Sequence, residues 1–191
     1  MSMPLEKRLY TYADYCTWPD EERVELIDGV MHNMSPAPNR RHQEILGALH
    51  GQFWTYLQGK SCKVYMSPFD VRLPRGDEPD EQVMTVVQPD LSVICDRNKL
   101  DDKGCRGAPD LVVEILSPSN PKHDLVRKLR LYERAGVREY WVVFPLDRIV
   151  QVYGLNDRGS YELTQFGGVK DTIEVGILPG LGVALETVFA E

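Results

Sequence analysis

Three acidic residues stand in or beside apolar runs that have the composition of buried strands. Asp90 opens the run PDLSVI, whereas Asp110 and Glu114 belong to PDLVVEILSPS. A carboxylate buried without a partner is costly, because its charged form loses its hydration. Side chains alternate across a strand, so Asp110 and Glu114 share one face of theirs. If the two strands lie side by side, Asp90 and Glu114 meet.

Two carboxylates that meet cannot both remain ionised without a counter-charge. Mg²⁺ and Mn²⁺ are hard cations that prefer oxygen ligands, so Asp90 and Glu114 are the predicted metal ligands. A cation held in this way polarises a phosphodiester and lowers the pKa of an attacking water. The chain has no GxSxG, HExxH or P-loop motif that would indicate another chemistry.

The composition is that of an ordinary globular protein, and we expect one domain over residues 1–191. The net charge of −7 argues against a large phosphate-binding surface, although a local basic stripe is compatible with it. No apolar run approaches the roughly 18 residues of a membrane span, and the N-terminus has no apolar signal core, which predicts a cytoplasmic protein. The four cysteines have neither CxxC nor zinc-ligand spacing, which predicts reduced thiols.

Apolar periodicity and turn residues predict the elements that position these acids. A hairpin turns at Asp28-Gly29, and a helix runs from about 41 to 57. A strand is expected over 62–73, followed by an exposed acidic loop over 74–82. Further strands surround Asp90 and Glu114, and a helix begins with Asn120 as N-cap and ends near Ala135 before Gly136. The hairpin of EYWVVF and RIVQVY follows, then short strands.

This order predicts an α/β or α+β fold with a mixed central sheet flanked by helices and preceded by an N-terminal β-hairpin. The near-continuous apolar run DLVVEIL predicts a strand covered on both faces. In the helix after it, an inward stripe is expected. That stripe comprises Leu125, Leu129 and Tyr132.

Several motifs in this order resemble a known family. The spacing of Pro-Asp and a second acid 24 residues later is similar to the PD-(D/E)xK nuclease superfamily. The closer resemblance is to the Uma-two family of restriction-endonuclease-like proteins, and it covers about residues 8 to 155. The motifs that carry it are VELIDGVM, His42 opening a helix, PFDVRL, QPDLSVI, PDLVVEILSPSN and HDLVRKLRLYERAGVREYWVV.

The resemblance implies a restriction-endonuclease-like fold and roles for the matching residues. Asp90 and Glu114 would hold Mg²⁺ or Mn²⁺, and Glu25 would be the acid near the start of the fold that completes the site. The superfamily pattern requires lysine two residues after Glu114, where this chain has Leu116. Lys128, on the following helix, is the first substitute for that lysine, and Lys122 is the weaker one.

Each of these residues also has a purely structural interpretation. Asp90 could begin a turn, Glu25 could pair with Arg23 or His32 across its hairpin, and Lys128 could be a solvated helix lysine. The remaining residues, which we regard as supporting at most, could act locally. Asp110 would cap the loop backbone, His42 would form a hydrogen bond near its helix start, and Asp124 would pair with Lys128.

Three functions follow from these residues. The first is a metal-dependent endonuclease that hydrolyses DNA, with DNA as its partner and a homodimer as its expected assembly, because two active sites cut two strands. The second is a nuclease fold that no longer cleaves and binds nucleic acid or protein, which Leu116 and the acidic charge favour. The third is a metal-dependent hydrolase of a smaller substrate.

Overall fold

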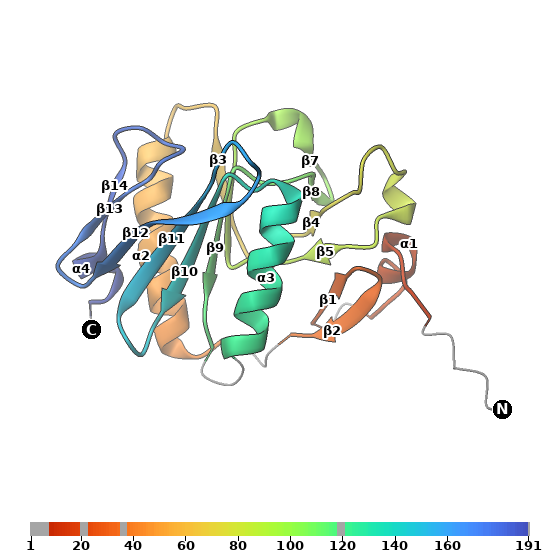
Figure 1. Cartoon of the computed structure of the whole chain (residues 1–191), viewed down its shortest axis with the longest axis horizontal. Coiled ribbons are helices and arrows are strands. Elements are labelled where there is room, and N and C mark those ends of the chain that lie inside the picture. Colours follow the sequence, from red (N-terminus) through yellow and green to blue (C-terminus); the bar gives the residue numbers. More distant parts are fainter. Residues whose placement is uncertain (1–7, 20–22, 35–37, 118–120, 191) are drawn as a thin grey trace.

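The computed structural model describes residues 8–19, 23–34, 38–117 and 121–190, and the side chains of all of these except 121–124. Its helices are α1 (Tyr12–Tyr15), α2 (Arg40–Leu57), α3 (Pro121–Ala135) and α4 (Leu185–Val188), with 3₁₀ turns η1 (Asp80–Gln82) and η2 (Arg97–Lys99). Figure 1 follows these elements from the N-terminal hairpin on one side to the C-terminal strands on the other.

The larger core belongs to a mixed sheet with the strand order β12-β11-β10-β9-β6-β3. Its strands are β3 (Lys63–Met66), β6 (Leu91–Ile94), β9 (Leu111–Ile115), β10 (Glu139–Phe144), β11 (Ile149–Leu155) and β12 (Tyr161–Gly168). Strands β9 and β10 are parallel and are joined through α3, whereas β6 runs antiparallel to β9. The expected mixed sheet with flanking helices is therefore confirmed.

Alternation along β9 explains why both faces of this sheet are covered. Leu111 and Val113 pack in one cluster with Phe53 of α2, and Val112 packs in another with Leu131 of α3. In Figure 1, α3 accordingly lies in front of the strands and α2 behind them. The short pair β13 (Thr172–Glu174) and β14 (Gly182–Ala184) completes the α2 side.

A second sheet holds the N-terminal hairpin, with the order β2-β1-β5-β4-β8-β7. Its strands are β1 (Val24–Ile27), β2 (Val30–Asn33), β4 (Val71–Arg72), β5 (Val86–Val87), β7 (Leu100–Asp101) and β8 (Gly104–Arg106). The hairpin turns at Asp28 and Gly29, which both have positive φ, as expected for Asp-Gly. Only Gln88, Pro89 and Asp90 separate β5 of this sheet from β6 of the other.

Two expectations are wrong. The strand expected over 62–73 is divided into β3 and β4, which belong to different sheets, with a cis Ser67-Pro68 peptide between them. The cysteines were expected to be reduced, but Cys62 and Cys95 form a disulfide. The register pairs Lys63 with Ile94, so the two cysteines extend neighbouring strands at the same level, which their sequence spacing does not reveal. Cys16 and Cys105 are free.

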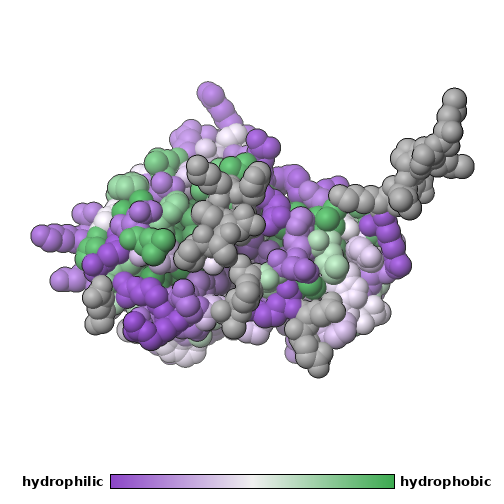
Figure 2. Space-filling view, turned by 90° about the horizontal axis from the view of Figure 1, so that it is seen from below, coloured by the Kyte–Doolittle hydropathy of each residue, from purple (hydrophilic) through white to green (hydrophobic). Residues whose placement is uncertain are grey.

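The C-terminal part carries exposed apolar side chains, notably Leu146, Leu163 and Phe166. Seen from below (Figure 2), hydrophobic residues are most frequent on the side that the C-terminal strands occupy in Figure 1. No helix formed by the described residues has the length and apolar content needed to span a membrane. The homodimer, the single domain and the cytoplasmic location stay predictions.

Gly104 tests the packing between β8 and the residue before β4. Its φ is +125°, and a Cβ added there would lie 2.2 Å from the backbone oxygen of Asp70. We expect Gly104→Ala to lower the free energy of unfolding by at least about 2 kcal/mol. The control is Gly47→Ala on the exposed side of α2, where a Cβ meets nothing within 4 Å. That change should raise stability by up to about 1 kcal/mol. Equal effects in urea denaturation would contradict this account.

Candidate active site

The register of β6 against β9 brings the two principal acids together. Leu91 pairs with Val113, so continuing the antiparallel register by one residue sets Asp90 opposite Glu114. The backbone N–H of Ile115 donates to Oδ2 of Asp90 at 2.7 Å. Asp90 is therefore held at the end of β9 beside Glu114, and it does not simply begin a turn.

A buried lysine joins Glu114 to the second sheet. The Nζ atom of Lys128 lies 2.8 Å from Oε1 of Glu114 and 3.0 Å from Oε1 of Glu25. The side chains of these three residues are no more than 10% exposed. The interpretation of Lys128 as a solvated helix lysine is therefore wrong. We call Glu25, Asp90, Glu114 and Lys128 the carboxylate cluster.

Helix α3 and the junction of the sheets position the members of this cluster. Lys128 lies on the side of α3 that packs on the sheet, one turn before the buried Leu131 and Tyr132. Glu25 lies on β1, and its Oε1 also accepts a hydrogen bond from the backbone N–H of Gln88 at 3.1 Å. Because Gln88 leads into Asp90, the same short segment fixes Glu25 and the start of β6.

Tyr132 was predicted only as part of the inward stripe, and the structure adds it to the site. Its hydroxyl donates to Oε1 of Glu114 at 2.6 Å, and its side chain is fully buried. Burial, together with the negative charge of Glu114, raises the pKa of Tyr132 well above its ordinary value, so the hydroxyl remains a donor. Its position one turn after Lys128 was the signal in the sequence.

The supporting residues divide into those near the cluster and those away from it. His42 lies on the first turn of α2, and its Nε2 is 3.2 Å from Oδ1 of Asp90. Asp110 accepts from the backbone N–H of Cys95 at 2.8 Å and from Arg138 at 3.2 Å, which fits the loop-capping interpretation. Lys122 and Asp124 lie in α3, but their side chains fall outside the described part of the chain.

The electrostatics of Glu114 follow from its burial among charges. Burial raises its pKa, Lys128 opposes that rise, and the negative charges of Asp90 and Glu25 add to it, with a result of about 8 against an ordinary 4.5. Without a further positive charge, the cluster therefore favours a protonated Glu114 at neutral pH. A bound cation would reverse this preference.

Comparisons with known proteins identify the fold and the family. A crystal structure of a protein from Anabaena variabilis, described as a putative nuclease belonging to DUF820, superposes with a TM-score of 0.73. It is 18% identical, and the match covers 94% of this chain and 97% of that one, which establishes the shared fold. An uncharacterized protein of Synechocystis sp. is 26% identical over 179 residues, covering 92% of this chain and 89% of the relative.

Fold and comparisons together define a restriction-endonuclease-like protein. Residues 11–186 match the family Uma2, described as "Putative restriction endonuclease". The chain belongs to this family, as the sequence motifs indicated. The roles of the individual residues in the carboxylate cluster stay predictions.

The raised pKa of Glu114 predicts a pH-dependent stability. Between about pH 4.5 and 8 the unfolded chain has lost the proton of Glu114 while the folded protein keeps it, so this contribution to stability is lost as pH rises. Glu114→Gln has no such proton. We expect its free energy of unfolding, relative to wild type, to rise across this window and to level off above it.

Urea denaturation at a series of pH values measures this difference. The control is Glu186→Gln, an exposed position on α4, whose difference from wild type should show no comparable rise. A Glu114→Gln difference that is constant between pH 5 and about 8, or that falls, would contradict the assignment of Glu114 as the protonated member of the cluster.

Proposed function

We propose that this protein is a metal-dependent endonuclease that hydrolyses phosphodiester bonds of DNA at the carboxylate cluster. The observation that carries the proposal is the contact of Lys128 with both Glu114 and Glu25, next to Asp90. Lys128 supplies the charged group that the motif lacks at Leu116. The restriction-endonuclease-like fold and the Uma2 family support the same reaction class.

The donor set suits Mg²⁺ or Mn²⁺. The hydrogen bonds between described residues that reach Glu114 and Glu25 end on Oε1, which leaves Oε2 of each to ligate a cation. Within the described residues there is no ready group of three or more metal-binding side chains. Mg²⁺ often takes only one or two protein carboxylates and completes its shell with water and substrate phosphate, and Asp90 with Glu114 matches that pattern.

A cation held by Asp90 and Glu114 would polarise the scissile phosphate and lower the pKa of the attacking water. The protein's own groups do the rest. The ammonium of Lys128 provides a positive charge beside Glu114 for orienting water and for the charge that develops on phosphate. Tyr132 holds the Glu114 carboxylate in one orientation, and His42 does the same for Asp90.

One observation favours the second function, a nuclease fold that binds without cleaving. Lys128 is paired with both Glu25 and Glu114 while all three side chains are at most 10% exposed, as in a structural ion network. A measurement of metal binding distinguishes the metal-dependent endonuclease from the nuclease fold that binds without cleaving. A third function, hydrolysis of a smaller substrate, has no observation of its own in its favour.

We expect Asp90→Asn and Glu114→Gln each to lower metal-dependent DNA cleavage by about a hundredfold or more, because each removes a ligand charge. The measurement is cleavage of a plasmid with Mg²⁺ or Mn²⁺. The matched control is Asp110→Asn, since the hydrogen bonds of the Asp110 side chain to described residues go to Cys95 and Arg138 and not to the cluster. Cleavage that survives Glu114→Gln, or that is lost equally in Asp110→Asn, would exclude this site.

Tyr132→Phe tests the positioning of Glu114. The change keeps the ring that packs against Tyr140, with centroids 5.1 Å apart, and removes only the hydroxyl. Loss of such a supporting hydrogen bond should weaken Mn²⁺ binding about tenfold or more. Calorimetric titration measures this affinity independently of activity. The control is Tyr153→Phe, a half-exposed tyrosine whose hydroxyl donates to Gln151, and its Mn²⁺ affinity should equal that of wild type.

A further inference from the structure

A pocket of about 350 Å³ lies beside the C-terminal half of α3, against the loop that follows β4 and the residue before β5. Arg75, Arg134 and Thr85 line it, together with apolar residues such as Leu73 and Leu131. None of the residues that line the pocket is acidic. The lining therefore carries two positive charges in a chain whose net charge is −7.

The two arginines converge on a single oxygen atom. Arg75 and Arg134 each donate from one terminal nitrogen to Oδ1 of Asp28, at 2.6 and 2.7 Å. Their side chains remain 55% and 53% exposed. Asp28 accepts from one terminal nitrogen of each guanidinium group, and each group has five N–H donors, so most of these donors are left for another acceptor. The remaining charge and donors suit an additional anion with several oxygens, such as phosphate.

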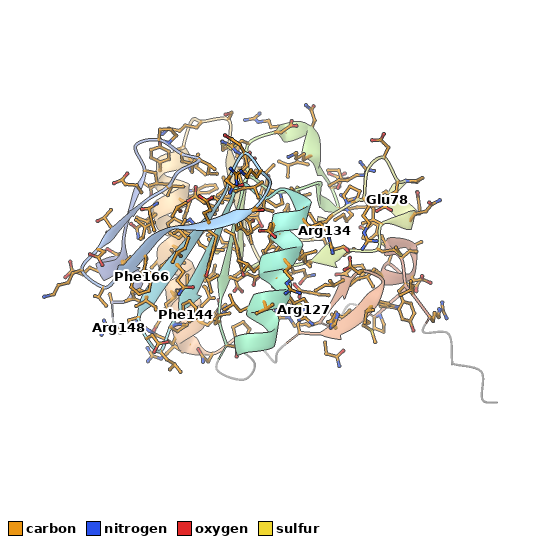
Figure 3. All side chains as sticks on the ribbon, viewed as in Figure 1. Glu78, Arg127, Arg134, Phe144, Arg148 and Phe166 are labelled. Carbon is orange, nitrogen blue, oxygen red and sulfur yellow. A yellow bond between two sulfur atoms is a disulfide. The ribbon has the colours of Figure 1, made fainter. Side chains whose placement is uncertain are left out.

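Local structure holds both arginines in place. The Glu78 carboxylate accepts from the backbone N–H of Arg75 at 2.8 Å, which fixes the loop. The hydroxyl of Thr85 accepts from the backbone N–H of Asp28 at 3.1 Å, so the hairpin turn is tied to β5. Figure 3 places Arg134 and Arg127 on the side of α3 that faces the hairpin and β5. The pocket is thus built from three segments distant in sequence.

The pocket and the carboxylate cluster both border helix α3. Arg134 follows Lys128 by six residues on α3, which corresponds to about 9 Å along the helix axis. At about 3.4 Å per nucleotide along one strand of a duplex, this is between two and three nucleotide steps. A duplex that lies along α3 with its scissile phosphate at the cluster would therefore reach the pocket with a phosphate two or three nucleotides away.

We propose that Arg75 and Arg134 form a binding site for a backbone phosphate of the nucleic-acid substrate. The identity of the substrate rests on the proposed function, whereas the anion site stands on the pocket and its arginines. Asp28 brings the two guanidinium groups together, offsets part of their mutual repulsion and is the internal competitor of the phosphate.

A purely structural role for these arginines makes a different prediction. Arg134 contacts Asp28 in the hairpin turn, and Nη1 of Arg127 lies 2.9 Å from Nδ1 of His32 on β2. Both contacts therefore also attach α3 to the hairpin. If attachment is their whole function, removing the charge of Asp28 weakens the structure and gains nothing. If the pocket binds phosphate, removing that charge strengthens binding.

The experiment is fluorescence anisotropy of a labelled DNA duplex with EDTA present, so that no cleavage occurs, over a series of salt concentrations. We expect Arg75→Gln and Arg134→Gln each to lower the slope of log Kd against log salt by about 0.9, because one phosphate contact is lost. Asp28→Asn should tighten binding about two- to fivefold, as for one exposed charge. Asparagine tolerates the positive φ of 51° at this position.

The matched control is Arg158→Gln, an exposed arginine in the turn between β11 and β12, which should leave the slope at the wild-type value. Arginine variants that behave like this control, or an Asp28→Asn variant that binds more weakly, would overturn the proposal. The gain expected for Asp28→Asn cannot arise from unfolding. Thermal denaturation of each variant checks that the arginine variants remain folded.

Inorganic phosphate as a competitor identifies the source of the anion. Displacement of DNA by phosphate in wild type, reduced in Arg134→Gln, supports the site. Arginine-dependent phosphate binding without DNA binding overturns its role in substrate recognition. DNA that binds with the expected arginine dependence but is never cleaved with Mg²⁺ or Mn²⁺ contradicts the proposed function and leaves this inference standing.

Discussion

The buried ammonium of Lys128 is the interaction on which the arrangement of the site depends. It is shared by Glu114 on the central sheet and Glu25 on the hairpin sheet, at 2.8 and 3.0 Å. Lys128 is the cation of these three side chains, so removing it would leave two buried carboxylates without their counter-charge, which proteins tolerate poorly. This requirement holds α3, β9 and β1 together around one point, and it sets the fully buried Tyr132 against Glu114. In the proposed function, the same contact would supply the charge that the motif lacks at Leu116.

Antiparallel pairing explains how acids 24 residues apart meet. After β6 the chain leaves the central sheet and forms β7 and β8 in the other sheet. It then returns as β9, which lies beside β6 and runs in the opposite direction. Asp90 at the start of β6 therefore faces Glu114 near the end of β9. The polar segment between β6 and β9 contains the short hairpin of β7 and β8. It needs no crossover helix, because β6 and β9 are antiparallel.

The sequence was most informative where one residue pattern has one physical meaning. The apolar run of β9 requires two covered faces, and Pro121 to Ala135 with Gly136 defines α3. The fold and the proximity of Asp90 to Glu114 could therefore be predicted. The division of 62–73 between two sheets could not, because each half is a reasonable strand alone. The Cys62–Cys95 disulfide and the hydroxyl contact of Tyr132 depend on register and helix rotation, which composition does not encode.

The most direct test of the carboxylate cluster is a crystal soaked in Mn²⁺ and measured for anomalous scattering, with a DNA strand bound to supply phosphate oxygens. The account predicts an anomalous peak within coordination distance, about 2.0–2.2 Å, of carboxylate oxygens of both Asp90 and Glu114. It also predicts that Lys128 remains beside Glu114. A peak elsewhere on the protein, or none at saturating Mn²⁺ with DNA in place, would contradict the central claim and favour a nuclease fold that binds without cleaving.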